Sequence, residues 1–138
     1  MRVMVFVKAN EDSEKGVMPT RELIEEMGKF NDELINAGIM LVGEGLKPTS
    51  AAKRVRFSGA KRTVVDGPFA ETKELVAGYW IWKVKSIEEA VEWVRKCPNP
   101  MQGEAEIEIR PIYEAEDFEA DLVDEVKAQQ ERARANAE

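Results

Sequence analysis

The sequence predicts an α+β fold of the ferredoxin-like type, in which strands and helices follow the order β-α-β-β-α-β. Three observations lead to this prediction. Strand-like and helix-like apolar patterns succeed one another in that order, each helix pattern begins at a suitable N-cap, and a hairpin pattern is inserted between the two halves. A charged, helix-like stretch follows the last strand.

Residues 3–7 form an apolar run rich in β-branched side chains, which is typical of a strand covered on both faces. After a polar loop, Thr20 is a suitable N-cap for a helix that continues to about Ala37. Gly38 then closes the helix. One buried stripe recurs along it at helical spacing: Leu23, Met27, Phe30 and Leu34.

A second strand is expected over residues 39–46, where Gly43 and Gly45 would let a ligand or another backbone approach closely. The inserted hairpin follows as RVRFSGAKRTVVD, residues 54–66, with its turn near Gly59. It is unusually basic, carrying Lys53, Arg54, Arg56, Lys61 and Arg62. Such a cluster is an anion-attracting rim, a partner surface, or a merely solvated strand face.

The strand expected over residues 75–84 is apolar on both faces. Ser86 then opens the second helix with a capping box, and the pair Cys97-Pro98 ends it. The last strand lies within residues 104–115, where Ala105, Ile107 and Ile109 alternate with charged residues. Residues 116–138 predict a C-terminal helix that docks by its first half and frays after about residue 130.

Two helices can cover only one face of such a sheet, yet the strand over residues 75–84 is apolar on both faces. The second face therefore needs a cover. A second copy of the chain is the simplest one, with the C-terminal segment as a lesser candidate. The sequence thus predicts a homodimer.

Composition excludes several classes of function. The net charge of −7 argues against a nucleic-acid partner, because phosphate binding needs a basic surface. No run approaches the roughly 20 apolar residues of a membrane span, and the N-terminal stretch has no signal-peptide cleavage pattern. The single cysteine, Cys97, suggests a reducing cytoplasm. Without any histidine, no metal site or cofactor is expected.

The stretch VVDGPFAETKE, residues 64–74, is the most distinctive passage. Further motifs accompany it: GEGL at 43–46, GYW at 78–80 and EIRP at 108–111. On these residues the chain resembles the YCII-related family, in its DGPF-domain branch. The resemblance covers residues 1–113, which we take as the domain, and leaves residues 114–138 as a charged helical extension.

The resemblance implies a dimeric α/β barrel. It names no activity, since members are mostly of unknown function, but some are linked to sigma factors of the extracytoplasmic-function group. Relatives in the wider superfamily perform cofactor-free chemistry on small organic molecules, and YCII-type members carry a His–Asp pair proposed as catalytic. This chain lacks histidine, and Lys47 stands where many relatives have one, so that pair cannot be carried over.

Asp66 is the first candidate site residue, with two interpretations. Asp-Gly and Gly-Pro pairs favour turns, so Asp66 could simply shape the chain. An Asx turn, however, bonds the side chain to the N–H two residues on, and that residue is Pro68, which has none. A ligand-facing role, as a catalytic acid–base group, therefore stays open. Catalysis by Asp66 alone would need a buried environment.

Three further residues are candidates for ligand binding: Glu44, Arg110 and Trp80. Glu44 lies between two glycines on an apolar strand, where it either faces a ligand or pairs with Arg110, Lys47 or Arg54. Arg110 is suited to gripping a carboxylate, although a salt bridge to Glu44 or Asp66 is the alternative. Trp80 is either core, dimer interface or pocket wall.

The sequence leaves three functions open. The first is a dimeric small-molecule-binding or regulatory protein without catalysis. The second is a cofactor-independent enzyme acting on a small organic molecule in a pocket between sheet and helices, with Asp66 as acid–base group and Glu44 and Arg110 orienting the ligand. The third, a partner of an extracytoplasmic-function sigma factor, rests on the resemblance alone.

Overall fold

The computed structural model describes residues 1–137, apart from the side chain of Lys73. Its centre is an antiparallel four-stranded sheet with the order β2-β5-β1-β6. The strands are β1 (Arg2–Lys8), β2 (Met40–Gly45), β5 (Val76–Lys83) and β6 (Ile107–Pro111). With helix α2 between β1 and β2, and α3 between β5 and β6, this is the predicted ferredoxin-like order.

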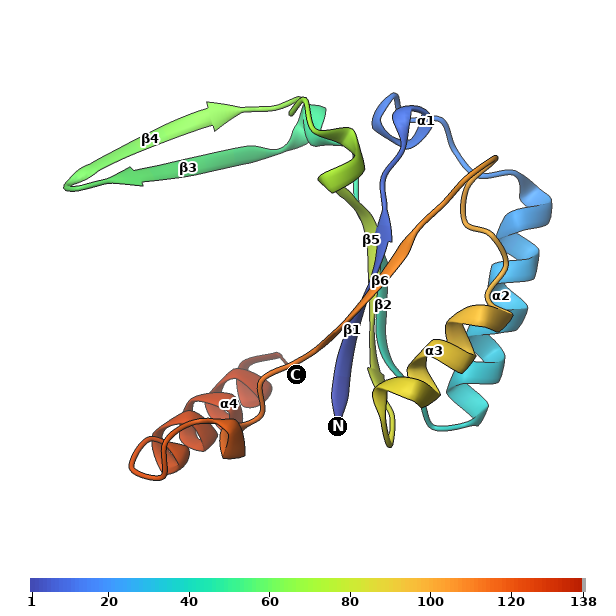
Figure 1. Cartoon of the computed structure of the whole chain (residues 1–138). Coiled ribbons are helices and arrows are strands. Elements are labelled where there is room, and N and C mark those ends of the chain that lie inside the picture. The colour runs from blue at the N-terminus through green and yellow to red at the C-terminus, as the bar shows by residue number, and fades with distance from the viewer. Residues whose placement is uncertain (138) are drawn as a thin grey trace.

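Both long internal helices, α2 (Arg21–Asn36) and α3 (Ile87–Lys96), cover the same face of the sheet (Figure 1). Both predicted N-caps are formed: the Thr20 hydroxyl accepts from the Leu23 amide at 3.1 Å, and that of Ser86 from the Glu89 amide at 3.2 Å. The core lies between the helices and this face, and contains Val3, Val5, Phe30, Leu34, Ile39, Trp80, Trp82, Val84 and Ala90.

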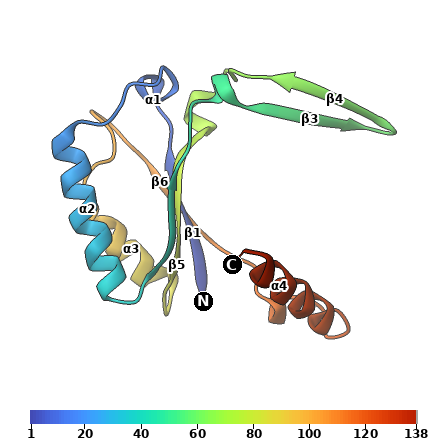
Figure 2. The ribbon, with the colours of Figure 1, turned by 180° about the vertical axis from the view of Figure 1, so that it is seen from behind.

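Two elements project from the opposite side of the sheet (Figures 1 and 2). One is the predicted hairpin, formed by β3 (Lys53–Ser58) and β4 (Lys61–Asp66), which we call the arm. The other is the C-terminal helix α4 (Val123–Ala137). They leave the sheet at opposite ends of its strands, because β2 leads to the arm, β6 leads to α4, and the two strands run in opposite directions.

The C-terminal region differs from the prediction in three ways. The last strand begins at Ile107, so Ala105 precedes it. Residues 115–117 form a short 3₁₀ turn and α4 begins only at Val123, continuing to Ala137 without fraying at residue 130. The helix also projects away from the sheet instead of docking on it (Figure 1). The surface of α4 is mostly polar and only weakly amphipathic, so the helix has little apolar area with which to dock on the sheet.

The DGPF segment fixes the arm to the rest of the chain. The Gly67 amide donates to the carbonyl of Ala52 at 2.9 Å, and the Phe69 amide donates to Thr49 Oγ1 at 3.1 Å. At Gly67 the two chain segments almost touch: a Cβ there would lie 1.7 Å from the Thr49 carbonyl oxygen. Only glycine allows this approach.

Thr49 also ties this junction to the short helix α1 (Glu11–Glu14). Its hydroxyl donates to Glu14 Oε2 at 2.5 Å, and its amide donates to Glu14 Oε1 at 3.1 Å. The Thr49 hydroxyl therefore joins α1 on one side to the DGPF segment on the other.

Within residues 1–137, no helix is long and apolar enough to cross a membrane.

We expect Gly67→Ala to lower the free energy of unfolding by about 3 kcal/mol or more, because backbone must move to admit the methyl group. The measurement is chemical denaturation followed by circular dichroism. Gly28→Ala is the matched control, since a Cβ there meets nothing within 4 Å and alanine favours a helix. A Gly67→Ala chain within about 0.5 kcal/mol of the parent would contradict this account of the motif.

Candidate functional site

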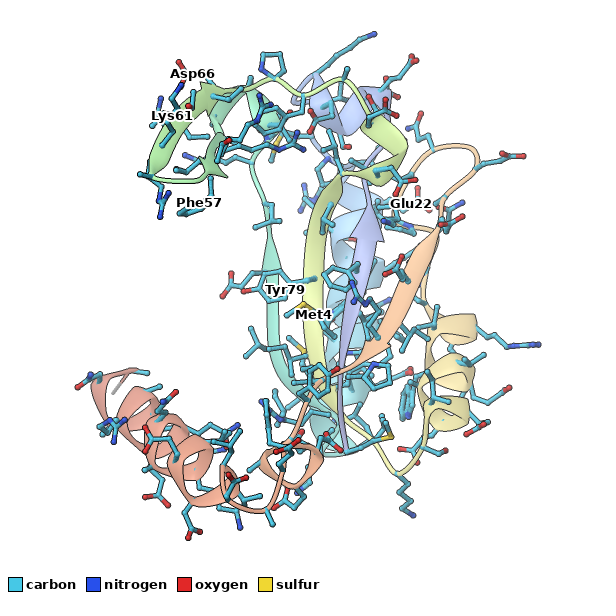
Figure 3. All side chains as sticks on the ribbon, turned by 60° about the vertical axis from the view of Figure 1, so that its left-hand side comes forward. Met4, Glu22, Phe57, Lys61, Asp66 and Tyr79 are labelled. Carbon is cyan, nitrogen blue, oxygen red and sulfur yellow. The ribbon has the colours of Figure 1, made fainter. Side chains whose placement is uncertain are left out.

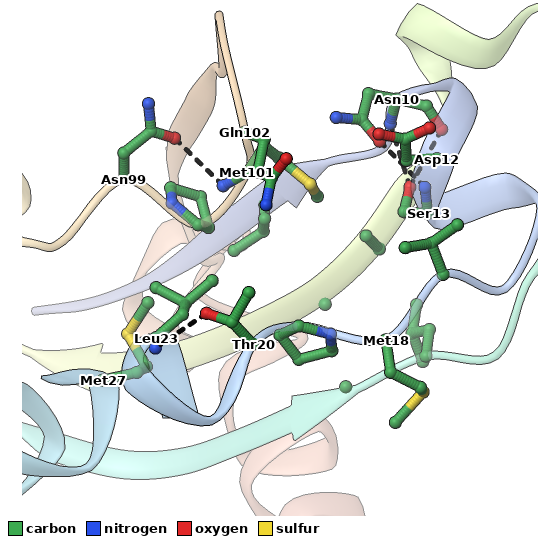
Figure 4. A pocket seen from close by; sticks show the side chains of 18 of the residues that line it. Asn10, Asp12, Ser13, Met18, Thr20, Leu23, Met27, Asn99, Met101 and Gln102 are labelled. Carbon is green, nitrogen blue, oxygen red and sulfur yellow. Dashed lines mark hydrogen bonds between the residues drawn. The ribbon is translucent and has the colours of Figure 1, made fainter. Parts of the chain in front are cut away.

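A cavity of about 920 Å³ lies on the helix-covered side of the sheet. It is bounded by the N-terminal half of α2, the ends of β2 and β5, the loop between α1 and α2, and the turn at residues 99–102 (Figure 4). Its wall is largely apolar and includes Val7, Val17, Met18, Leu23, Met27, Leu46, Trp80 and Met101. This size and lining are typical of sites for small organic molecules.

Three glycines line the cavity along β2 and β5: Gly43, Gly45 and Gly78. Gly45 and Gly78 are opposite each other in the strand register. A Cβ on Gly45 would meet nothing within 4 Å, whereas one on Gly43 would lie 2.8 Å from the Trp80 ring. The sheet is therefore open at Gly45, whereas side chains of Met40 and Trp80 fill the space next to Gly43.

Trp80 belongs both to the core and to the cavity wall. It is buried, and its ring stands edge-on to that of Phe30 with the centroids 6.1 Å apart. Its Nε1 donates to Asn31 Oδ1 at 3.0 Å. The polar atom of the indole is thus satisfied by α2, while its ring contributes apolar surface to the site.

The two loops at the mouth of the cavity are held by their own hydrogen bonds (Figure 4). Asn10 Oδ1 accepts from the Ser13 amide at 2.8 Å, and the Ser13 hydroxyl accepts from the Asn10 amide at 2.9 Å. On the other side, Asn99 Oδ1 accepts from the Met101 amide at 3.0 Å. Local hydrogen bonds therefore hold both loops at the mouth.

The charged residues among the lining are exposed and mostly acidic. They are Asp12, Glu22, Glu26, Glu44 and Lys47. Glu44 is paired in register with Tyr79, so its carboxylate lies on the other face of β2. The remaining three carboxylates against one ammonium group still give the rim a negative potential, which disfavours anionic ligands.

The four candidate residues do not form one site. Glu44 and Trp80 line the cavity, but Asp66 and Arg110 do not. Arg110 lies on β6, at the sheet edge opposite β2, and its Nε is 3.9 Å from Glu108 Oε2. Within the described residues Glu44 forms none of the predicted ion pairs with Arg110, Lys47 or Arg54.

Asp66 lies at the base of the arm, where its Oδ1 accepts from Lys53 Nζ at 2.5 Å. Its side chain is 72% exposed, so the single chain does not supply the burial that acid–base catalysis by Asp66 would need. It does not cap the turn either, since the amides of Gly67 and Phe69 are bonded to Ala52 and Thr49. In the single chain Asp66 therefore takes part in an ion pair with Lys53, and its ligand-facing role stays a prediction.

Other reactive groups are few in the part of the chain that the structure describes. Burial raises the pKa of the Cys97 thiol to about 11, so this group is protonated at neutral pH and is a poor nucleophile. No cluster of three Cys, Asp or Glu side chains within residues 1–137 could hold a metal ion.

Sequence reasoning did not identify Asn31, Gly78 or the loop methionines as parts of a site. Asn31 had a usable signal, because it lies four residues after Met27 and so interrupts the apolar stripe of α2 with a polar side chain. Gly78 interrupts an otherwise bulky strand in the same way. Met18 and Met101 carried no signal, since they lie in loops that only the tertiary structure brings to the cavity.

The chain is 31% identical over 90 residues to an uncharacterised protein of Rhizobium meliloti, covering 65% of this chain and 73% of that protein. It is also similar to the solved structure of 5-chloro-2-hydroxyhydroquinone dehydrochlorinase from Burkholderia phenoliruptrix in complex with 2,5-dihydroxybenzoquinone. That similarity has a TM-score of 0.48 at 14% identity and covers 86% of this chain and all of the other.

A family model, described as the YCII-related domain, matches residues 1–116. This span contains the whole sheet, the arm, both covering helices and every residue that lines the cavity. The chain therefore belongs to the YCII-related domain family.

Proposed function

We propose that this protein binds a small, largely apolar organic molecule in the cavity beside α2, and that it does so as a homodimer. The cavity is the observation that supports ligand binding. It is large enough for a small organic molecule, it is lined mainly by apolar side chains, and its mouth is already formed. The acidic rim favours a neutral or cationic molecule over an anionic one.

A side chain that fills the cavity should weaken ligand binding without destabilising the fold. In Gly45→Leu the new side chain enters open space on the same side of β2 as Gly43, where it occupies volume that a ligand would use. We expect the affinity for the neutral fluorescent probe N-phenyl-1-naphthylamine to fall about tenfold or more. The measurement is a fluorescence titration, with thermal melting as a check on the fold.

Gly28→Leu is the matched control, because a Cβ on Gly28 also meets nothing within 4 Å but Gly28 does not line the cavity. It should bind the probe like the parent chain. Equal probe affinity in the Gly45→Leu and Gly28→Leu chains would refute the cavity as the binding site.

The enzyme alternative depends on Asp66, and the position of this residue weakens it. We expect Asp66→Asn to leave probe affinity unchanged within about twofold. The free energy of unfolding should change by less than about 1 kcal/mol, because the ion pair with Lys53 is exposed. The same titration and melting experiments measure both quantities. A strong loss of affinity with unchanged melting would instead place Asp66 at the ligand site and revive the catalytic hypothesis.

The open face of the sheet supports the second part of the proposal. Met4 and Phe6 alternate with the buried Val3 and Val5 along β1, so they lie on the face away from the helices. Their strand partners Ile81 and Tyr79 extend the apolar surface on β5. Figure 3 looks onto this face and shows Met4 and Tyr79 on it, with no covering layer among the described residues.

These four side chains are partly exposed and adjacent to one another, and a second copy offers the same apolar surface in return. We propose that two open faces pack together, as the resemblance to dimeric α/β barrels implies. The two faces of the sheet would then serve different purposes, ligand binding on the helix side and association on the other.

Sedimentation equilibrium at micromolar concentration should give twice the 15.6 kDa mass of the single chain. Phe6→Glu should shift the equilibrium towards monomer, because the carboxylate would be buried unpaired between the two sheets. Ile24→Glu is the control, since Ile24 is an exposed apolar residue on α2. A parent chain that sediments only as a monomer would overturn the dimer.

A further inference from the structure

We propose that, in this dimer, the arm of each chain packs against the C-terminal segment of its partner. We define the C-terminal segment as residues 114–137, the 3₁₀ turn and α4 with the residues between them. The inference rests on the proposed homodimer, but it adds a second contact that the open sheet faces do not provide. Nearly all of this segment lies beyond the residues matched by the family model.

The arm by itself is an incomplete structure. It is a two-stranded hairpin that extends away from the sheet, and every residue from Lys53 to Val64 is exposed. Isolated two-stranded hairpins are only marginally stable in water. The arm nevertheless carries three exposed large apolar side chains: Val55, Phe57 and Val64. A packing partner is therefore needed to cover it.

The C-terminal segment has the same incomplete character. It projects from the same side of the sheet as the arm, and α4 has no buried residue. Large apolar side chains are exposed here as well: Phe118 and Leu122, together with Tyr113 just before the segment. The rings of Tyr113 and Phe118 lie 5.7 Å apart and make one aromatic surface.

The two elements carry opposite charge. Residues 53–66 contain five basic side chains and a single acidic one, Asp66. Residues 114–125 contain seven acidic side chains and no basic one. Because the whole chain is acidic, the arm is the exception, and its natural complement within a homodimer is the most acidic stretch of the partner.

The position of the two elements makes this contact geometrically available. The arm and the C-terminal segment lie at opposite ends of the strands but on the same side of the sheet (Figures 1 and 3). When two such chains pack by their open faces, a two-fold axis perpendicular to the strands brings each arm to the same end of the strands as the partner's C-terminal segment. An axis parallel to the strands would instead place arm beside arm and acid beside acid.

Charge therefore favours the two-fold axis perpendicular to the strands over the parallel one, because the parallel axis would bring like charges together. The strand register places Val55, Phe57, Arg62 and Val64 on one face of the arm, and Arg56 and Lys61 on the other. Both faces are therefore basic, and the partner's C-terminal segment packs against the face that carries Arg56 and Lys61. Because the interface is isologous, the same contact forms twice in each dimer.

A charge-swap experiment tests this contact in the full-length chain. Arg56 and Lys61 are exposed on the arm, and Asp121 and Asp124 are exposed in the C-terminal segment. None of the four forms an ion pair within the described part of its own chain. The arm variant is Arg56→Glu with Lys61→Glu, the C-terminal variant is Asp121→Lys with Asp124→Lys, and a third chain carries all four changes.

We expect each double variant to raise the dimer dissociation constant roughly tenfold, and the fourfold variant to recover most of the parent affinity. The dissociation constant is measured by sedimentation at two salt concentrations, and salt should weaken the parent dimer. Lys29→Glu and Asp32→Lys, on the exposed side of α2, are the matched charge controls and should leave the dissociation constant unchanged.

The outcomes separate this inference from the dimer itself. Double variants that dimerise like their controls, or a fourfold variant no tighter than either double variant, would overturn the arm contact while leaving the dimer in place. A parent chain that is monomeric would overturn both. Recovery of the fourfold variant from both double variants is the result expected when the arm and the C-terminal segment act on each other. Restoring the net charge alone would relieve repulsion in the arm variant but would not tighten the C-terminal variant.

Discussion

The structure depends on one constraint: a four-stranded sheet has two faces, and this chain has helices for only one of them. Helices α2 and α3 bury Val3, Val5, Trp80 and Trp82 on the covered face, which makes the hydrophobic core. The alternating residues of the same strands are left on the other face. The core, the cavity and the open surface all follow from this division, because each strand serves both sides.

The cavity arises where the helix layer is incomplete. Beside the N-terminal half of α2, the sheet offers Gly43, Gly45 and Gly78 instead of bulky side chains, and the loops before α2 and after α3 complete the wall. Trp80 and Tyr79 show how closely the two proposed roles are joined. These adjacent residues of β5 lie on opposite faces of the sheet. A shift of the β5 backbone would therefore move both the ligand site and the proposed dimer surface.

The contacts of the DGPF segment show that it has a structural role. Gly67 is required because the backbone of Thr49 passes where any side chain would begin. Thr49 connects this point to Glu14 in α1, next to the loop that forms the cavity mouth. The segment thus holds the arm, the loop before it and α1 in one arrangement. Asp66, the residue that first suggested chemistry, is exposed and forms an ion pair with Lys53.

The sequence alone determined the strands, the two covering helices with their caps, the arm and the family, because these depend on local periodicity and short motifs. The tertiary structure decided which candidate residues meet. Trp80 faces the cavity and Glu44 borders it, whereas Arg110 lies at the opposite sheet edge, a separation set by strand order and not by spacing along the chain. The place of α4 was also beyond the sequence, since its weakly amphipathic surface specifies a helix but no docking site within its own chain.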